Sequence, residues 1–202
     1  MPINVPKAKV FPQVEAGSYI GRCYSVIHIG TTHFEYQGNQ KQSNKVRLTF
    51  ELPTELHEFK EGEGAKPYAV SVEYTLSLHE KSKLRPMLKG LRGKDLTEEE
   101  ADSFDVASLV GQVAFLNIVH SEKGYAEIAS ISKVPKGMEC PSQVNASVVL
   151  DYNNFNEAVF EKLPNFIKDK MRSSDEYKAM KGIKTGDEPL LDENGGEIPF
   201  LL

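Results

Sequence analysis

An alternation of apolar and polar side chains in residues 44–52 is the first feature that could carry chemistry. The apolar set is Val46, Leu48, Phe50 and Leu52, and the polar set is Lys45, Arg47, Thr49 and Glu51. A period of two predicts a strand with one buried and one solvated face, so we expect Lys45 and Arg47 to face solvent. Such cations can contact phosphates, although the same pattern also fits an ordinary solvated surface.

Aromatic side chains near these cations are candidates for stacking on nucleobases. Arg22 and Tyr24 share one face of residues 18–30, a segment rich in β-branched and aromatic residues that we expect to form a strand. Proteins that bind single strands combine such aromatic platforms with cations that follow the phosphates. Tyr24 fits a core position equally well, so both alternatives stay open for it.

Phe34, Tyr36 and Lys41 lie in a polar stretch, residues 31–43, that we expect to form a loop. Buried packing is less expected for an aromatic residue in a polar loop than in a strand. Phe34 and Tyr36 are therefore the better candidates for stacking.

Residues 81–94 carry the strongest local charge signal. Six cations occur there without any acid, namely Lys81, Lys83, Arg85, Lys89, Arg92 and Lys94. Neutralising phosphates with Lys and Arg releases counterions and supplies most sequence-independent affinity for nucleic acid. We interpret the stretch as a rim that binds a nucleic-acid backbone, and the alternative is a solubilising connector.

The overall charge argues against a typical nucleic-acid-binding protein, since the net charge is −5 and the pI is about 5.6. Residues 1–94 hold 14 Lys and Arg against nine Asp and Glu, whereas residues 95–140 hold nine acids against three cations. Charge per segment is therefore more informative than the average. We interpret the acids of residues 95–105 mainly as favourable charge at helix N-termini. We predict no metal, no cofactor and no enzymatic activity, and a nuclease using those acids is a rival hypothesis.

The order of predicted elements indicates a mainly β fold. The predicted strands are residues 18–30, 44–52, 68–78, 112–120 and 125–134, with short helices between the third and fourth. Thr97 and Glu100 form a capping-box pattern within that helical insert. Five strands with this insert correspond to an OB-type barrel, which binds oligonucleotides on strands 2 and 3 and the flanking loops. Another small barrel or a sandwich is the alternative.

The chain divides into four predicted segments. They are an extended N-terminal arm (1–16), a nucleic-acid-binding domain (17–140), an extension with a helix (141–183) and an acidic tail (184–202). We expect the helix to begin near Pro164, with Phe166, Ile167, Met171 and Tyr177 as an apolar stripe that packs on the barrel. The absence of a signal-peptide pattern and of a bilayer-length apolar run predicts a cytoplasmic protein.

The acidic tail ends in an apolar tip that could enter a pocket of a partner protein. The residues concerned are Asp192, Glu193, Glu197, Ile198, Pro199 and Phe200, followed by Leu201 and Leu202. This pattern resembles the C-terminal tip of bacterial single-stranded-DNA-binding proteins. The resemblance implies that the tail recruits replication or recombination proteins.

The body of the chain resembles a group of bacteriophage single-stranded-DNA-binding proteins. The similar segments are residues 17–24, 27–31, 45–53, 109–112, 128–132, 161–165 and 174–178. The resemblance implies an OB fold, a role in protecting single strands during phage DNA replication, recombination and repair, and a location in the host cytoplasm.

We therefore predict sequence-tolerant binding of single-stranded DNA. The predicted DNA-binding residues are Arg22, Tyr24, Phe34, Tyr36, Lys41, Lys45, Arg47, Lys81, Lys83, Arg85, Lys89, Arg92 and Lys94. An adaptor that contacts proteins and not DNA is the alternative. A preference for duplex DNA or RNA and the formation of a homodimer both remain open.

Overall fold

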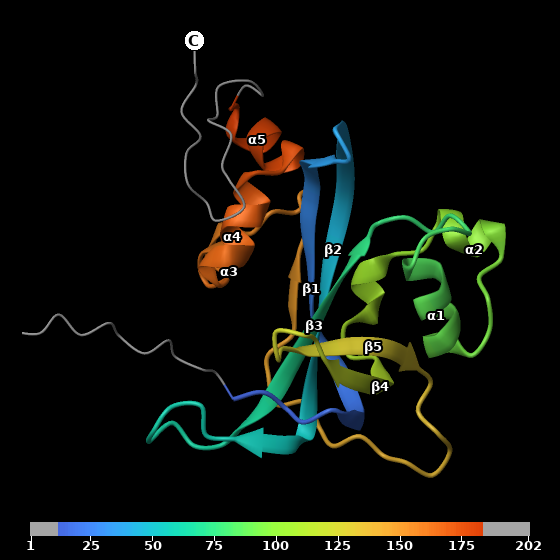
Figure 1. The fold of residues 1–202 in the computed structure, drawn as a ribbon, viewed down its shortest axis with the longest axis vertical. Helices are drawn as coiled ribbons and strands as arrows, with labels where there is room; N and C mark the ends of the chain where they lie inside the picture. Colours follow the sequence, from blue (N-terminus) through green and yellow to red (C-terminus); the bar gives the residue numbers. More distant parts are fainter. Residues whose placement is uncertain (1–11, 184–202) are drawn as a thin grey trace, which may run out of the picture. The chain divides into compact units, whose positions relative to one another are not determined.

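The computed structural model describes residues 12–183 (Figure 1). These residues form two compact units, one of residues 12–27 and 46–149 and the other of residues 28–45 and 150–183. The predicted tail (184–202), with Asp192, Glu193, Glu197, Ile198, Pro199 and Phe200, lies outside the described residues. Most of the predicted arm (1–16) also lies outside them.

The described chain is mainly β, as predicted, and its six strands form one antiparallel sheet. The strands are β1 (Gly17–Tyr36), β2 (Asn39–His57), β3 (Lys66–Thr75), β4 (Val113–His120), β5 (Ala126–Ser132) and β6 (Val148–Leu150). Their order is β3-β2-β1-β4-β5, and β6 also pairs with β1. Within the described part of the chain no strand pairing joins β3 to β5, so the sheet is open and the predicted barrel is not closed.

The helical insert lies between β3 and β4, as predicted. It consists of α1 (Leu84–Arg92), α2 (Glu98–Asp102) and a 3-10 turn at Val106–Leu109. The capping box is confirmed, because the Thr97 hydroxyl accepts from the Glu100 amide and the Glu100 carboxylate accepts from the Thr97 amide.

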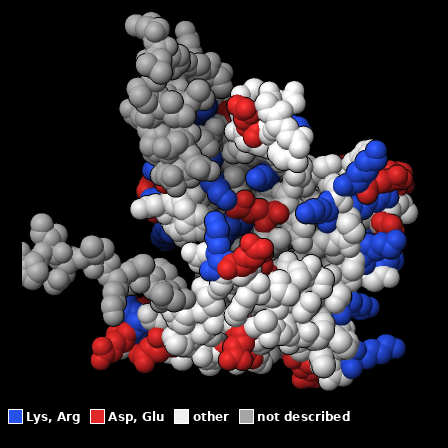
Figure 2. Space-filling model, viewed as in Figure 1, with Lys and Arg blue, Asp and Glu red and all other residues white. Residues whose placement is uncertain are grey.

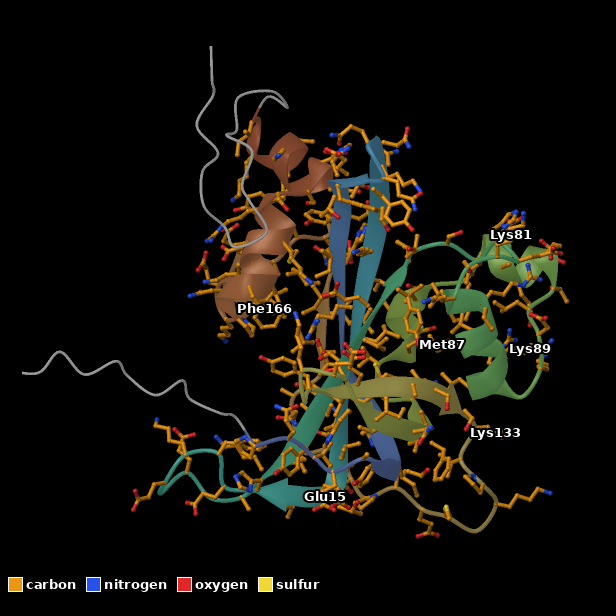
Figure 3. The ribbon with its side chains drawn as sticks, in the orientation of Figure 1. Glu15, Lys81, Met87, Lys89, Lys133 and Phe166 are labelled. Carbon is orange, nitrogen blue, oxygen red and sulfur yellow. The ribbon has the colours of Figure 1, made fainter. Side chains whose placement is uncertain are left out.

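Helix α1 packs closely on β5. It buries Met87 and exposes Lys89 on its other side (Figure 3). A Cβ on Gly90 would lie 2.6 Å from the Ile131 carbonyl oxygen, and the Lys133 amide donates to the Gly90 carbonyl at 2.9 Å. The absence of a side chain at Gly90 therefore allows this contact.

The prediction that one face of β2 is solvated is wrong. Glu51 is fully buried and Thr49 is 9% exposed. Residues 141–149 cover this face, because the Glu51 carboxylate accepts from the Val144 amide (2.8 Å), the Asn145 amide (2.8 Å) and the Asn145 side chain (2.7 Å). A buried carboxylate needs such donors to offset the loss of its hydration.

We expect Glu51→Ala to lower the free energy of unfolding by about 2–3 kcal/mol, since charge-assisted hydrogen bonds are lost and their donors are left without this acceptor. Urea unfolding followed by circular dichroism measures the change. Glu127→Ala, at an exposed position of β5, is the matched control and should stay within about 0.5 kcal/mol of wild type. Equal stabilities of the two variants would contradict the role assigned to Glu51.

The predicted loop at residues 31–43 is instead the end of a long hairpin. β1 and β2 continue to a two-residue turn at Gln37 and Gly38, whose φ angles are 52° and 74°. Positive φ at both central residues is the geometry that matches the twist of antiparallel strands. Gly38 adopts its positive φ without strain, because glycine has no side chain. The tight turn allows both strands to continue through this polar sequence.

The second unit joins this hairpin end to three helices, α3 (Glu157–Glu161), α4 (Asn165–Arg172) and α5 (Asp175–Lys181). The helix predicted near Pro164 is confirmed, with Pro164 as the N-cap of α4. Ile167, Met171 and Tyr177 of the predicted stripe are buried. Phe166 does not belong to it, because its side chain is 52% exposed.

Contacts between α5 and the hairpin hold this unit together. The Glu176 carboxylate accepts from the Thr31 amide at 2.6 Å and from its hydroxyl at 2.8 Å. A Cβ on Gly30 would lie 2.7 Å from Ser174 and Glu176 side-chain atoms, and Gly30 has a φ of 94°. Position 30 therefore requires glycine for two reasons, namely the positive φ angle and the close approach of the Ser174 and Glu176 side chains.

Candidate nucleic-acid interface

The predicted DNA-binding residues are divided between the two units. Phe34, Tyr36, Lys41 and Lys45 belong to the unit of residues 28–45 and 150–183, and the other nine belong to the first unit. The set therefore comprises two surfaces, each with its own supporting elements.

The cations of residues 81–94 are largely paired, contrary to the interpretation of a rim free of acids. The acids of residues 95–100 fold back on them, giving Arg85–Asp95 (3.4 Å), Arg85–Glu98 (2.8 Å), Lys89–Asp95 (3.1 Å), Arg92–Glu100 (2.6 Å) and Lys94–Glu100 (3.8 Å). In Figure 2 basic and acidic side chains lie next to one another over the viewed face. In the described part of the chain, Lys81 and Lys83 are the exposed cations of this stretch without an ion pair.

Arg85 has a structural role within the insert. Its side chain is 12% exposed, and besides the two ion pairs it donates to the carbonyl oxygens of Leu78 (3.3 Å) and Leu96 (3.0 Å). These bonds hold the segment after β3 against the start of α2. A guanidinium with these partners is poorly placed to bind phosphate.

Arg22 and Tyr24 on β1 are half-buried. Arg22 donates to the carbonyl oxygens of Gly111 and Pro141, both at 3.1 Å, and burial raises the pKa of Tyr24. Arg22 thus fastens the segments that contain Gly111 and Pro141 to this strand.

Arg47 was expected to face solvent, but its side chain is only 18% exposed. Its guanidinium donates to the Glu73 carboxylate on β3 at 2.9 Å. The pair is nearly neutral as a unit, so Arg47 offers a phosphate little charge while Glu73 is ionised.

Phe34 and Tyr36 are exposed at the hairpin end, as their polar neighbours in the sequence predicted. Phe34 is 42% exposed and Tyr36 is 53% exposed. The ammonium group of Lys41 lies 4.4 Å from the centre of the Tyr36 ring. Phe34 and Tyr36 occupy alternate positions of β1 and therefore share a face. This surface combines ring faces with a cation, the chemistry that accommodates a stacked nucleotide.

A second surface of this chemistry lies in the first unit, in a groove that the sequence analysis did not predict. This β2–β3 groove has a volume of about 400 Å³ and is lined by Pro12, Gln13, Val14, Arg47, Phe59, Pro67, Tyr68, Ala69, Val70, Ser71, Tyr125 and Ala126. It unites the segment before β1, the β2–β3 connection, the start of β3 and the turn between β4 and β5.

Aromatic rings dominate one side of this groove. The rings of His57, Phe59 and Tyr68 lie within 5.1–5.6 Å of one another, centre to centre. Phe59 is 44% exposed and Tyr125 is 61% exposed. Phe59 lies in a polar Glu/Gly/Lys stretch. An aromatic residue in a polar stretch was the pattern that selected Phe34 and Tyr36, and the same pattern could have identified Phe59. Tyr125 follows the Gly124 turn, and its proximity to Tyr68 depends on folding.

The wall of the groove before β1 is held by specific bonds. The Gln13 side chain accepts from the Ala126 amide at 3.0 Å, and His120 Nε2 lies 2.8 Å from the Val14 carbonyl oxygen. Val14 is buried. The groove therefore has one wall that is fastened to the β4–β5 turn.

Comparisons of the chain with protein-family models, with curated proteins and with solved structures give no match. Among residues 12–183, no helix has both the length and the apolar character needed to cross a bilayer.

The ion pairs of the helical insert predict a specific pH dependence. The hydrogen bond from Arg92 and that from the Thr97 amide lower the pKa of Glu100 from 4.5 to about 2. Because the folded state lowers this pKa, the stabilisation from Glu100 is present above pH 4.5 and is lost as the pH falls toward 2. We expect the difference in unfolding free energy between wild type and Glu100→Gln to shrink over this range, as measured by urea unfolding at a series of pH values.

Glu99→Gln is the control for this experiment, since Glu99 is exposed and forms no ion pair with a described residue. Its difference from wild type should vary less with pH. A Glu100→Gln difference that stays constant between pH 6 and pH 3 would contradict the pairing of Glu100 with Arg92.

Proposed function

We propose that the chain is a binding protein for single-stranded DNA, without catalytic activity, and that the β2–β3 groove holds the strand. The observation that carries this proposal is the aromatic lining of the groove, in which Phe59 and Tyr125 are exposed and Tyr68 is half-buried. Every base has a ring face, so stacking on these side chains accepts any sequence.

The strand order supports an OB-type arrangement. The order β3-β2-β1-β4-β5, with residues of β3 also near β5, is the order that a partly open five-stranded barrel would have. Helix α1 lies between β3 and β4 in the chain and contacts β5. In OB-folds oligonucleotides bind on strands 2 and 3 and on flanking loops, including the loop between strands 4 and 5. The groove is lined by Arg47 of β2, by the start of β3 and by the β4–β5 turn, and also by residues 12–14 and Phe59.

The cations available for phosphate are few and dispersed. Lys123, two residues before Tyr125 in the β4–β5 turn, is exposed, as are Lys81, Lys83, Lys133 and Lys136 of the first unit. Few phosphate contacts mean few released counterions, so we expect binding with a shallow dependence on salt. Phe34, Tyr36 and Lys41 would provide a further stacking surface in the second unit.

The acidic residues of the tail, with its Ile-Pro-Phe sequence, would recruit replication or recombination proteins. This part of the proposal rests on the sequence of residues 192–200 and on the resemblance of the chain to bacteriophage single-stranded-DNA-binding proteins.

The ion pairs of the helical insert favour one alternative function, an adaptor that contacts proteins and not DNA. Arg85, Lys89 and Arg92 already bind acids of this chain, so this surface has little net charge to offer phosphates. The two functions differ in whether oligonucleotides bind at all.

Fluorescence anisotropy of labelled oligo-dT, beside a matched duplex and over a salt series, distinguishes the two functions. Single-strand DNA binding predicts tighter association with oligo-dT than with duplex. Removal of residues 187–202 controls for competition by the acidic tail. Failure of both the full chain and the truncated chain to bind at low salt would support the adaptor.

Tyr125→Ala and Phe59→Ala test the groove directly. We expect each to weaken binding of oligo-dT by about 1–3 kcal/mol, roughly 5- to 150-fold, because one stacking partner is lost. Tyr125→Phe keeps the ring and should bind like wild type. Circular dichroism confirms that each variant is folded. Undiminished binding by both alanine variants would exclude the groove as the site.

Glu73→Gln tests whether the ion pair with Glu73 prevents Arg47 from binding phosphate. Removing the carboxylate charge should let Arg47 contact a phosphate, tighten binding at low salt and steepen the salt slope by about 1. Adding Arg47→Ala to this variant should abolish the steeper slope. A slope that remains steep in the double variant would show that the effect comes from the loss of Glu73 alone.

A further inference from the structure

A second cleft of the first unit lies just beyond the end of β3. This α2 cleft has a volume of about 500 Å³ and is lined by Leu76, Ser77, Leu78, His79, Leu84, Glu98, Ala101, Asp102, Phe104 and Val106. Six of these residues are apolar, and the charged ones, Glu98 and Asp102, are both acidic. No Lys or Arg of the described chain lines it.

Neighbouring acids reinforce the negative character of the cleft. Glu99 lies on α2 beside Asp102, and both are exposed without an ion pair to any described residue. Glu98 is 80% exposed at its side chain and pairs with Arg85. Lys81 and Lys83 are the nearest unpaired cations in the sequence, but they do not line the cleft. A DNA backbone would be repelled here, whereas a basic and apolar peptide would be attracted.

This chain contains a segment of that composition. Residues 1–11 carry Lys7 and Lys9 without any acid, together with the apolar residues Ile3, Val5, Val10 and Phe11. We propose that residues 1–11 of one copy dock in the α2 cleft of a second copy, and thereby link the copies head to tail. This surface is separate from the β2–β3 groove.

Residues 1–11 are attached at Pro12, and the distance from there to the α2 cleft explains why the cleft belongs to a second copy. Pro12 lines the β2–β3 groove together with Tyr68, near the start of β3, and the cleft begins at Leu76. Leu76 lies eight positions after Tyr68 along the direction of β3, a distance of roughly 26 Å. Val5 lies seven residues from Pro12 and reaches roughly 24 Å at full extension. Within one copy Lys7, Lys9 and Phe11, which all lie between Val5 and Pro12, would therefore fall short of the cleft.

A charge exchange in the full chain tests this proposal without DNA. One variant carries Lys7→Glu with Lys9→Glu, and the other carries Glu99→Lys with Asp102→Lys. Wild type should self-associate with increasing concentration in sedimentation velocity, and each variant alone should associate about tenfold more weakly because like charges then face each other. An equal mixture should regain wild-type association, since each arm then meets a cleft of opposite charge.

The matched control exchanges two exposed acids elsewhere, Glu122→Lys with Glu139→Lys, and should associate like wild type. A photocrosslinking phenylalanine at position 11, in a mixture of ¹⁵N-labelled and unlabelled protein, should join that position to residues 97–106 of the other isotopic form. A wild type that stays monomeric, a mixture that does not regain association, or crosslinks confined to one isotopic form would each overturn the proposal. None of these readouts depends on whether the chain binds DNA.

Discussion

The buried carboxylate of Glu51 is the constraint on which much of the first unit depends. It lies in the middle of β2 with no exposed surface, and its hydrogen bonds to Val144 and Asn145 require residues 141–149 to cross the outer face of the strand. The same covering segment supplies the Pro141 carbonyl to Arg22. With this face closed, the exposed rings of the first unit, Phe59 and Tyr125, lie elsewhere, in the β2–β3 groove.

Charge is balanced locally in this protein. The cations of α1 meet the acids of residues 95–100 within the same insert, and Lys60 and Lys66 both bind Glu63. These exposed pairs contribute little stability individually, but they cancel the field that a phosphate backbone would experience. A nucleic-acid interface on such a surface has to rely on ring stacking more than on counterion release. The exposed rings at the β2–β3 groove and at the hairpin end fit that requirement.

Glycine allows a close contact between a helix and a strand in each unit. Gly90 permits α1 to approach β5, and Gly30 permits α5 to approach the hairpin while adopting a positive φ. In the second unit the Glu176 carboxylate then binds Thr31 directly. The hairpin that carries Phe34 and Tyr36 is therefore braced by a helix more than a hundred residues later in the chain.

Local sequence patterns determined the positions of the five main strands, the helical insert with its capping box, and the helix after Pro164, because periodicity and capping act over a few residues. The exposure of Phe34 and Tyr36 also followed from their polar neighbours. Tertiary structure alone decided the partners of charged groups: the alternation in β2 predicted a solvated Glu51 and Arg47, and both are covered by residues distant in sequence. It likewise decided the groove, since Phe59, Tyr68 and Tyr125 meet only when the β2–β3 connection and the β4–β5 turn are folded together. Pairings of this kind depend on long-range packing, which no local period encodes.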